Sequence, residues 1–259
     1  KFHRKKSITR LKKELDFLVK KYDPNLIYFV VDTFLAMSNR EFDELKELYS
    51  DYKIPFWMNT RAETINEYRA AGLEEMNMLR MNIGIEHGNY DYRRTYLKRN
   101  VKDEVQIRAF EIAAEHKYAS CANSIIGMPD ETRDLIFDTI NFVRKLPDNI
   151  DATGAFIFAP YHGTPLRDLA IKKGYIKDEE ICSLSNTSES MLRMPTISKN
   201  EIQGLAKVFS LYTKFPENRW SEIKIAEKDD LEGTKMMEKL GKEFDDTYRQ
   251  FAAASDLHD

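Results

Sequence analysis

Short apolar runs alternate with amphipathic segments along the first two thirds of the chain. Each apolar run spans six to nine residues and is rich in β-branched and aromatic side chains, which is typical of strands in a parallel sheet. The segments between them place apolar residues three and four positions apart, which indicates helices. The predicted strands are residues 26–32, 55–60, 78–86, 119–127 and 152–160. The predicted helices among and after them are residues 39–52, 62–72, 105–116, 133–146 and 165–174.

The order of these elements predicts an α/β fold. Strand and helix alternate five times, which favours a parallel sheet with right-handed crossover helices. The strands are short and evenly spaced, so we expect a partial (β/α) TIM-type barrel over residues 1–176. A helix from Ser7 to Tyr22 opens the pattern with no strand before it, so the first strand of the barrel is expected to be missing.

The last third of the chain follows another pattern. Residues 197–215 and 230–251 read as helices with no strand between them, which predicts a C-terminal helical extension over residues 177–259. Local signals mark the ends of several helices. Ser7 and Thr164 are expected to cap helices at their N-termini, and Gly72 is expected to close the helix 62–72.

Composition narrows the class of protein. The chain carries 40 basic and 43 acidic residues, a net charge of -3 that draws it neither to nucleic acid nor to anionic membranes, so neither is an expected partner. No apolar run approaches the ~20 residues of a membrane span. The two cysteines, Cys121 and Cys182, form no paired motif and fit a reducing cytoplasm. The first residue is Lys and no signal peptide is visible, so we expect a piece of a longer protein.

Polar side chains gather where the predicted strands end. In parallel α/β folds, function concentrates at the carboxyl ends of strands. Asp32 and Glu86 are the strongest candidates for ligand-binding residues, because each directly follows an apolar strand. Most other polar residues in loops are simply exposed to solvent. A carboxylate can accept hydrogen bonds from both hydroxyl groups of a ribose and can also form an ion pair with an amino group. The five predicted strand ends carry residues 32–33, 59–61, 86–88, 127–131 and 160–163.

At these strand ends stand the motifs "LIYFVVDTF", "NIGIEHGN", "YLKRNV", "SIIGMPDET" and "YHGTPL". Together they resemble those of the radical S-adenosylmethionine (SAM) enzymes of the cobalamin-binding-domain type. "LIYFVVDTF" is similar to the family's second-strand motif, although Val31 replaces one of its two acids. "NIGIEHGN" resembles the fourth-strand "IGIESGS", and "YLKRNV" resembles part of the helix after it. "SIIGMPDET" resembles "GxPGET", and "YHGTPL" resembles "YPGTPL". The tail "LAKVFSLYTKFPENRW" resembles the family's helical tail. Five motifs in order make a stronger signal than any one alone.

The resemblance implies a role for each matching residue. Asp32 and Thr33 would meet the amino group of the methionyl moiety of SAM, and Glu86 would meet the ribose hydroxyls. Arg99, with Arg94 as a weaker candidate, would meet the methionyl carboxylate. The residues that would pack around the adenine are Asn123, Ile126, Gly127 and the backbone near Pro160. The residues that would face the substrate are Asn59, Arg61 and Tyr161, whereas Trp57 is more often a core residue. Asp130 and Glu131 are expected to be mainly structural, in the turn before the helix 133–146, which either Thr132 or Asp130 is expected to cap.

One departure from the family is large. The iron–sulfur cluster of these enzymes is held by a Cys-x3-Cys-x2-Cys loop, and this chain has no such loop. The ligands of a 4Fe-4S cluster are therefore expected outside this chain, which alone is expected to be inactive and to self-associate through its open barrel edge. The resemblance further implies SAM as cofactor, cobalamin through an upstream domain, a flavodoxin or ferredoxin as electron donor, and methyl transfer. The substrate, a small molecule or a peptide, is unknown.

Two alternatives remain open at the level of sequence. One is a cofactor-independent barrel enzyme with a carboxylate pair at Asp32 and Glu86, which would need neither iron nor reductant. The other is a binding module that keeps the barrel but has no catalytic activity. His162, beside Tyr161, could in principle act as an acid or base but is better explained as a turn residue before the helix that begins at Pro165.

Overall fold

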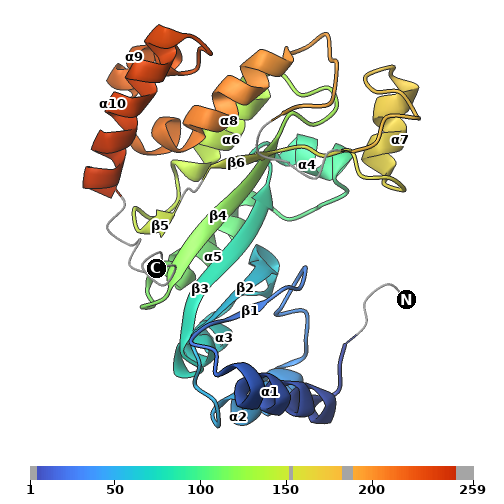
Figure 1. Cartoon of the computed structure of the whole chain (residues 1–259), viewed down its shortest axis with the longest axis vertical. Helices are drawn as coiled ribbons and strands as arrows, with labels where there is room; N and C mark the ends of the chain where they lie inside the picture. Colours follow the sequence, from blue (N-terminus) through green and yellow to red (C-terminus); the bar gives the residue numbers. More distant parts are fainter. Residues whose placement is uncertain (1–4, 152–153, 183–188, 249–259) are drawn as a thin grey trace.

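The computed structural model describes residues 5–151, 154–182 and 189–248, and its centre is a parallel sheet (Figure 1). The strands are paired in the order β1-β2-β3-β4 along the sheet. β5 pairs with the start of β4 and β6 with its end, so together they form the last position of the sheet. The sheet does not close, which confirms a partial barrel. Its strands are β1 (Ile27–Phe29), β2 (Phe56–Arg61), β3 (Met78–Glu86), β4 (Ala119–Ile126), β5 (Ile150–Asp151) and β6 (Ala155–Ile157).

Helices connect and cover the strands largely as the apolar periodicity predicts. Side-chain caps form at Ser7, Thr132 and Thr164, each of which accepts the backbone N–H three residues ahead. The helices before the C-terminal part are α1 (Ile8–Tyr22), α2 (Asn39–Tyr49), α3 (Glu67–Glu75), α4 (Tyr90–Tyr96), α5 (Asp103–Ala114), α6 (Arg133–Val143) and α7 (Pro165–Lys172). The C-terminal helices are α8 (Lys199–Lys214), α9 (Trp220–Ala226) and α10 (Leu231–Tyr248), with short 3₁₀ turns at Ala62–Thr64 and Glu217–Arg219.

The first strand is shorter than its sequence predicts. The apolar run 26–32 was expected to be buried on both faces, but only Ile27–Phe29 pairs as a strand. Tyr28 and Val30 are 47% and 82% exposed. β1 has a single strand neighbour, β2, and nothing among the described residues covers the inner face at this edge. Self-association through this exposed edge stays a prediction.

Two helix predictions were wrong in detail. α3 continues past Gly72 to Glu75, and a Cβ at Gly72 would lie 2.6 Å from a ring carbon of Phe42, so this glycine allows close packing and does not end the helix. The segment 96–101, expected to be helical, is mostly a turn, and the helix there is α4, which ends at Tyr96.

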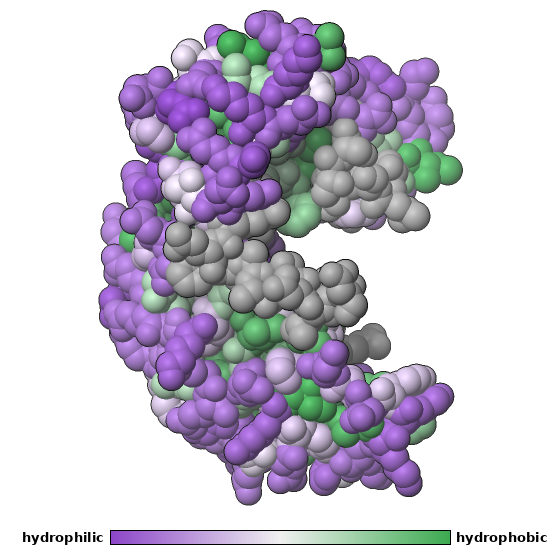
Figure 2. All heavy atoms as spheres, turned by 60° about the vertical axis from the view of Figure 1, so that its left-hand side comes forward, coloured by the Kyte–Doolittle hydropathy of each residue, from purple (hydrophilic) through white to green (hydrophobic). Residues whose placement is uncertain are grey.

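The two faces of the sheet differ in character because alternate side chains point to opposite sides. The outer face packs on the helices through fully buried Met58, Met81 and Ile83. The inner face carries Asn59 and Asn82, which are register partners on β2 and β3. In Figure 2 the outline of the molecule is open on one side, with hydrophilic side chains over the outer curve and hydrophobic ones inside the hollow.

The C-terminal helices lie at the end of the molecule opposite α1 and α2 (Figure 1). α8 packs on both β6 and α6, and its buried residues Leu205, Val208 and Phe209 belong to the same hydrophobic core as the sheet. The predicted boundary near residue 176 therefore divides two parts that share a core, and it stays a prediction. No helix of the described ranges is both long and apolar enough to cross a bilayer.

The turn after β3 is packed against α6 without room for a side chain at Gly88. A Cβ there would lie 2.4 Å from Cα of Thr139 and 2.5 Å from the carbonyl oxygen of Asp138. We expect Gly88→Ala to lower the free energy of unfolding by about 1–3 kcal/mol, because backbone must move to admit the methyl group. Urea denaturation measures this change.

Gly241→Ala is the matched control. Gly241 lies inside α10 and a Cβ there meets no atom within 4 Å. The same substitution is therefore expected to raise the free energy of unfolding by up to about 1 kcal/mol through helix propensity. Equal effects at the two glycines would contradict the packing described for Gly88.

Candidate functional site

The carboxyl ends of the strands surround a pocket of about 240 Å³. Five residues singled out in the sequence lie together in its wall: Asp32, Asn59, Arg61, Glu86 and Asn123. They come from β2, β3, β4 and the segment after β1, which confirms that these strand ends meet at one edge. Thr60, part of the strand end 59–61, also lines the pocket, although no role was predicted for it. The sequence reasoning missed the other lining residues, which are Asn82, Gly84, Ile125 and Phe156.

Glu86 is the last residue of β3 and stands in the pocket beside a guanidinium group. Its backbone has a φ of 64°, a left-handed conformation that costs a non-glycine residue about 1–3 kcal/mol. Burial raises the pKa of its carboxyl, while Arg99 and Arg61 act to lower it. A Cβ at Gly84 would lie 2.6 Å from Oε1 of Glu86, so a side chain there would displace the carboxylate.

Arg99 links two carboxylates behind the pocket. One guanidinium nitrogen donates to Oε1 of Glu86 at 2.8 Å and the other lies 3.4 Å from Oε2 of Glu63. Glu63 also pairs with Arg61 at 2.5 Å, so two acids and two bases alternate around this wall. The Arg99 side chain is 7% exposed, which shows that it is no solvated helix end, whereas Arg94 is exposed and pairs with Asp91.

Arg93 explains why Arg99 reaches Glu86. It is fully buried and donates to the carbonyls of His87 and Val101, at 2.6 and 3.0 Å, and to the carboxylate of Asp103. The backbone N–H of Arg99 in turn donates to the carbonyl of Arg93 at 3.1 Å. These bonds fold the segment 87–103 back on itself. Sequence reasoning missed Arg93, although a third arginine beside Arg94 was visible.

A row of hydrogen-bonded side chains crosses the inner face below the pocket. Asn59 donates to the hydroxyl of Tyr28 at 2.9 Å, and Asn82 donates to the amide oxygen of Asn59 at 3.0 Å. Arg80 continues the row from Asn82 to Asp151, with which it forms an ion pair at 2.9 Å. A polar row thus runs across the inner face of β2 and β3, beside apolar side chains of the same hollow.

The opposite wall is apolar, but the isoleucine on it is not the one the sequence suggested. Ile125 and Phe156 line the pocket. Ile126 is fully buried on the outer face of β4, because neighbouring residues on a strand point to opposite sides. A Cβ at Gly127 would lie 3.0 Å from the side chain of Ile202, on that same outer side.

The other predicted residues lie outside the pocket lining. Pro160 is buried and its carbonyl accepts from Arg167 at 3.0 Å. Tyr161 is 51% exposed, and the carbonyl of Thr33 accepts the N–H of Ala36 at 3.1 Å. The cofactor and substrate roles of all these residues stay predictions.

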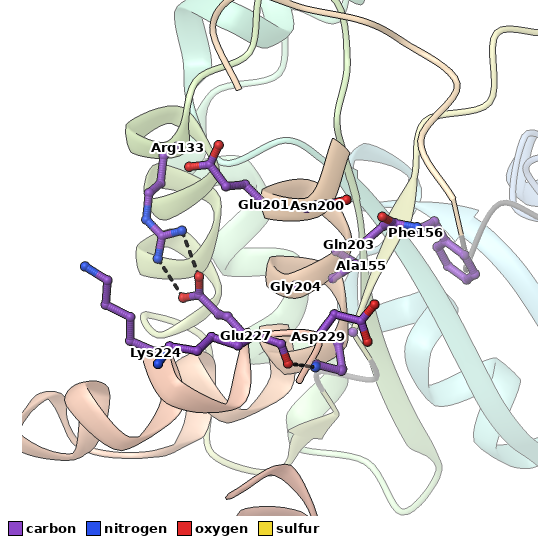
Figure 3. Close-up of a pocket in the computed structure, with 14 residues that line it drawn as sticks. Arg133, Ala155, Phe156, Asn200, Glu201, Gln203, Gly204, Lys224, Glu227 and Asp229 are labelled. Carbon is purple, nitrogen blue, oxygen red and sulfur yellow. Dashed lines mark hydrogen bonds and ion pairs between the residues drawn. The ribbon is translucent and has the colours of Figure 1, made fainter. Parts of the chain in front are cut away.

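A larger cavity, of about 960 Å³, lies away from the strand ends (Figure 3). It runs between β6 and the helices α6, α8 and α9. Two of its basic groups are engaged within the protein: Arg133 forms two bonds to Glu227, at 2.9 and 2.6 Å, and Lys207 donates to the carbonyl of Lys228. Phe156 borders both cavities.

The described residues are suited to bind some of the cofactors that the sequence suggests and not others. No group of three or more His, Cys, Asp or Glu side chains in the described ranges could hold a metal ion, and Cys121 is buried in β4. An iron–sulfur cluster therefore does not fit these residues. The pocket offers two carboxylates, the guanidinium group of Arg61 and amides opposite an apolar wall, groups with which a polar nucleoside can form hydrogen bonds.

Comparison with known proteins points to one family. Over 166 residues, 64% of this chain and 36% of the relative, the sequence is 30% identical to the uncharacterized methyltransferase PH0819 of Pyrococcus horikoshii. The chain thus spans about a third of that relative's length.

Two solved structures share the fold. The cobalamin-dependent SAM radical enzyme OxsB superposes with a TM-score of 0.58 at 13% identity, over 92% of this chain and 41% of that chain. The radical SAM methyltransferase TsrM from Kitasatospora setae gives a TM-score of 0.53 at 15% identity, over 66% of this chain and 34% of that chain.

The family model of the radical SAM superfamily matches residues 1–143, which is more than half of the 259 residues. The protein therefore belongs to the radical SAM superfamily.

Proposed function

We propose that the pocket at the strand ends binds S-adenosylmethionine. The observation that carries this proposal is that Glu86 and Asp32 line one pocket while Arg99, just behind the lining, forms an ion pair with Glu86. Glu86 would accept the ribose hydroxyls, Arg99 would receive the methionyl carboxylate, and Asp32 would meet the amino group. The nitrogen Nε of Arg99 is buried without a hydrogen-bond partner in the described part of the chain, as expected of a group that awaits a ligand.

The apolar wall would hold the adenine. Ile125 and Phe156 offer flat contact opposite the polar wall. Asn123 on β4 is placed to exchange hydrogen bonds with a heterocycle edge. We therefore assign the adenine contact to Ile125 in place of Ile126, and the substrate side to Asn59 and Arg61.

As the reaction class we propose methyl transfer by a radical SAM enzyme of which this chain is one part. The similarity to a relative named as a methyltransferase supports this class. A 4Fe-4S cluster would be held by cysteines outside these residues, and cobalamin, if the enzyme uses it, by another part of the protein. A flavodoxin or ferredoxin as electron donor and a cytoplasmic location stay predictions.

Calorimetry with S-adenosylhomocysteine, a stable analogue of the cofactor, tests the site. We expect Arg99→Gln and Glu86→Gln each to weaken binding by about 10- to 100-fold, because each removes a charged hydrogen-bonding group. Arg94→Gln is the matched control for Arg99→Gln, because Arg94 is exposed and outside the pocket. Absence of binding to the wild-type chain would favour the cofactor-independent site at Asp32 and Glu86.

The pH dependence of this binding follows from Glu86. A ribose diol donates to the ionised carboxylate, and burial raises the pKa of this carboxyl above its usual 4.5. Affinity should therefore be full at high pH and fall as the pH drops through that raised pKa. Calorimetry between about pH 8 and pH 5 measures the change. Glu86→Gln should bind weakly with no such dependence, and a flat profile for the wild type would contradict the role of Glu86.

A further inference from the structure

A buried contact between an acid and an imidazole lies behind the pocket and has no part in the proposed binding roles. His87 follows Glu86 directly, Glu131 lies in the turn after β4, and neither is exposed to solvent. Nε2 of His87 lies 3.0 Å from Oε1 of Glu131. The contact thus joins the turn after β3 to the turn after β4, two segments separated in the chain by α4, α5 and β4 itself.

The other oxygen of Glu131 holds its own turn. Oε2 accepts the backbone N–H groups of Gly127 and Met128, the second at 3.0 Å. Gly127 has a φ of 78°, a conformation that favours glycine, and this conformation turns its N–H towards the carboxylate. A buried carboxylate is stable only where donors satisfy it. Glu131 is therefore committed to the turn and cannot serve a ligand.

The imidazole of His87 has one orientation. Its Nδ1 accepts the backbone N–H of Asn89 at 2.9 Å, which leaves the ring proton on Nε2. Nε2 lies at ion-pair distance from Oε1 of Glu131, but neither atom has a hydrogen-bond partner in the described part of the chain. The ring stacks on Tyr92 with centroids 4.3 Å apart, and the Tyr92 hydroxyl donates to the carbonyl of Pro129 at 2.7 Å. Two routes, the acid–imidazole contact and this tyrosine, therefore connect the same two turns.

We infer that His87 and Glu131 are positioning residues that hold the two turns as one unit. The unit sets the spacing across the pocket between Glu86, one residue before His87, and Ile125, two residues before Gly127. The ligand of this pocket is an adenine nucleoside, which must contact residues beside both turns at the same time. The inference rests on the proposed function, since it takes Glu86 and Ile125 as ribose and adenine contacts.

Binding of two ligands distinguishes the positioning role of Glu131 from the binding role of Arg99. S-adenosylhomocysteine carries the amino-acid tail, and 5′-methylthioadenosine lacks it. We expect Glu131→Gln to weaken both ligands by about tenfold, because the displaced turn contacts the nucleoside that they share. Arg99→Gln should weaken S-adenosylhomocysteine more than 5′-methylthioadenosine. Calorimetry measures the affinity of both variants and of the wild type for each ligand, and urea denaturation of Glu131→Gln shows whether the variant is folded under the conditions of the binding experiment.

Asp130→Asn is the matched control. Asp130 is the neighbouring acid in the same turn, but it bonds to Tyr96, Tyr175 and Lys173 and not to the pocket side. Its φ of 65° is one that asparagine also adopts, so the variant should fold and bind both ligands as the wild type does. If Asp130→Asn weakens them as much as Glu131→Gln, the inference is wrong.

The outcomes distinguish this inference from the proposed function. If the wild-type chain binds neither ligand, the proposed function fails. If it binds both and Glu131→Gln binds them equally well, only the positioning role fails. Should Glu131→Gln not fold, amide NMR of the wild type decides. 5′-Methylthioadenosine should shift the signals of Gly127, Met128 and Asn89 together, and shifts confined to one turn would overturn the inference.

Discussion

The parallel register of the strands is the constraint on which the site depends. Asn59 lies beside Asn82, and Arg61 lies beside Gly84, which in turn lies beside Asn123. Because side chains alternate between faces, this register places a polar row on the inner face and an apolar layer against the helices. A slip of one residue would exchange the two faces and bury the amides. The register therefore creates both the core and the pocket.

Within this frame, the environment of each acid decides what it can do. Glu131 is fully buried: one of its oxygens accepts two backbone N–H groups, and the other lies 3.0 Å from Nε2 of His87. Glu86 stands at the pocket with one guanidinium partner, Arg99, and Asp32 is exposed at the mouth. A buried carboxylate must find partners, whereas one at a pocket can exchange them for a ligand. The same residue type thus serves structure in one turn and recognition in the next.

Much of the fold could be predicted because the spacing of apolar residues within a segment indicates which face of that segment is buried. Most of the helices and the positions of the strands followed from apolar spacing, although α4 and α9 did not. Ser7 and Thr164 cap helices as predicted, and of the two candidates Thr132 and Asp130 it is Thr132 that caps α6. The errors have physical causes. Gly72 looked like a helix end but makes room for Phe42, a contact that lies 30 residues away in the chain. The run 26–32 looked like a buried strand, yet nothing in the described chain covers its inner face.

The sequence by itself determined which strand ends carry polar chemistry, because each motif is local to one strand and the turn after it. Only the tertiary structure decided which of these side chains face a common pocket. Ile125 and Ile126 are indistinguishable by composition, and the pleat of β4 alone turns the first towards the pocket. Arg93 and His87 could not be assigned from sequence either, since their partners lie in other segments and their roles arise from burial. Glu131 was expected to be structural, but its contact with His87 is visible only in the structure.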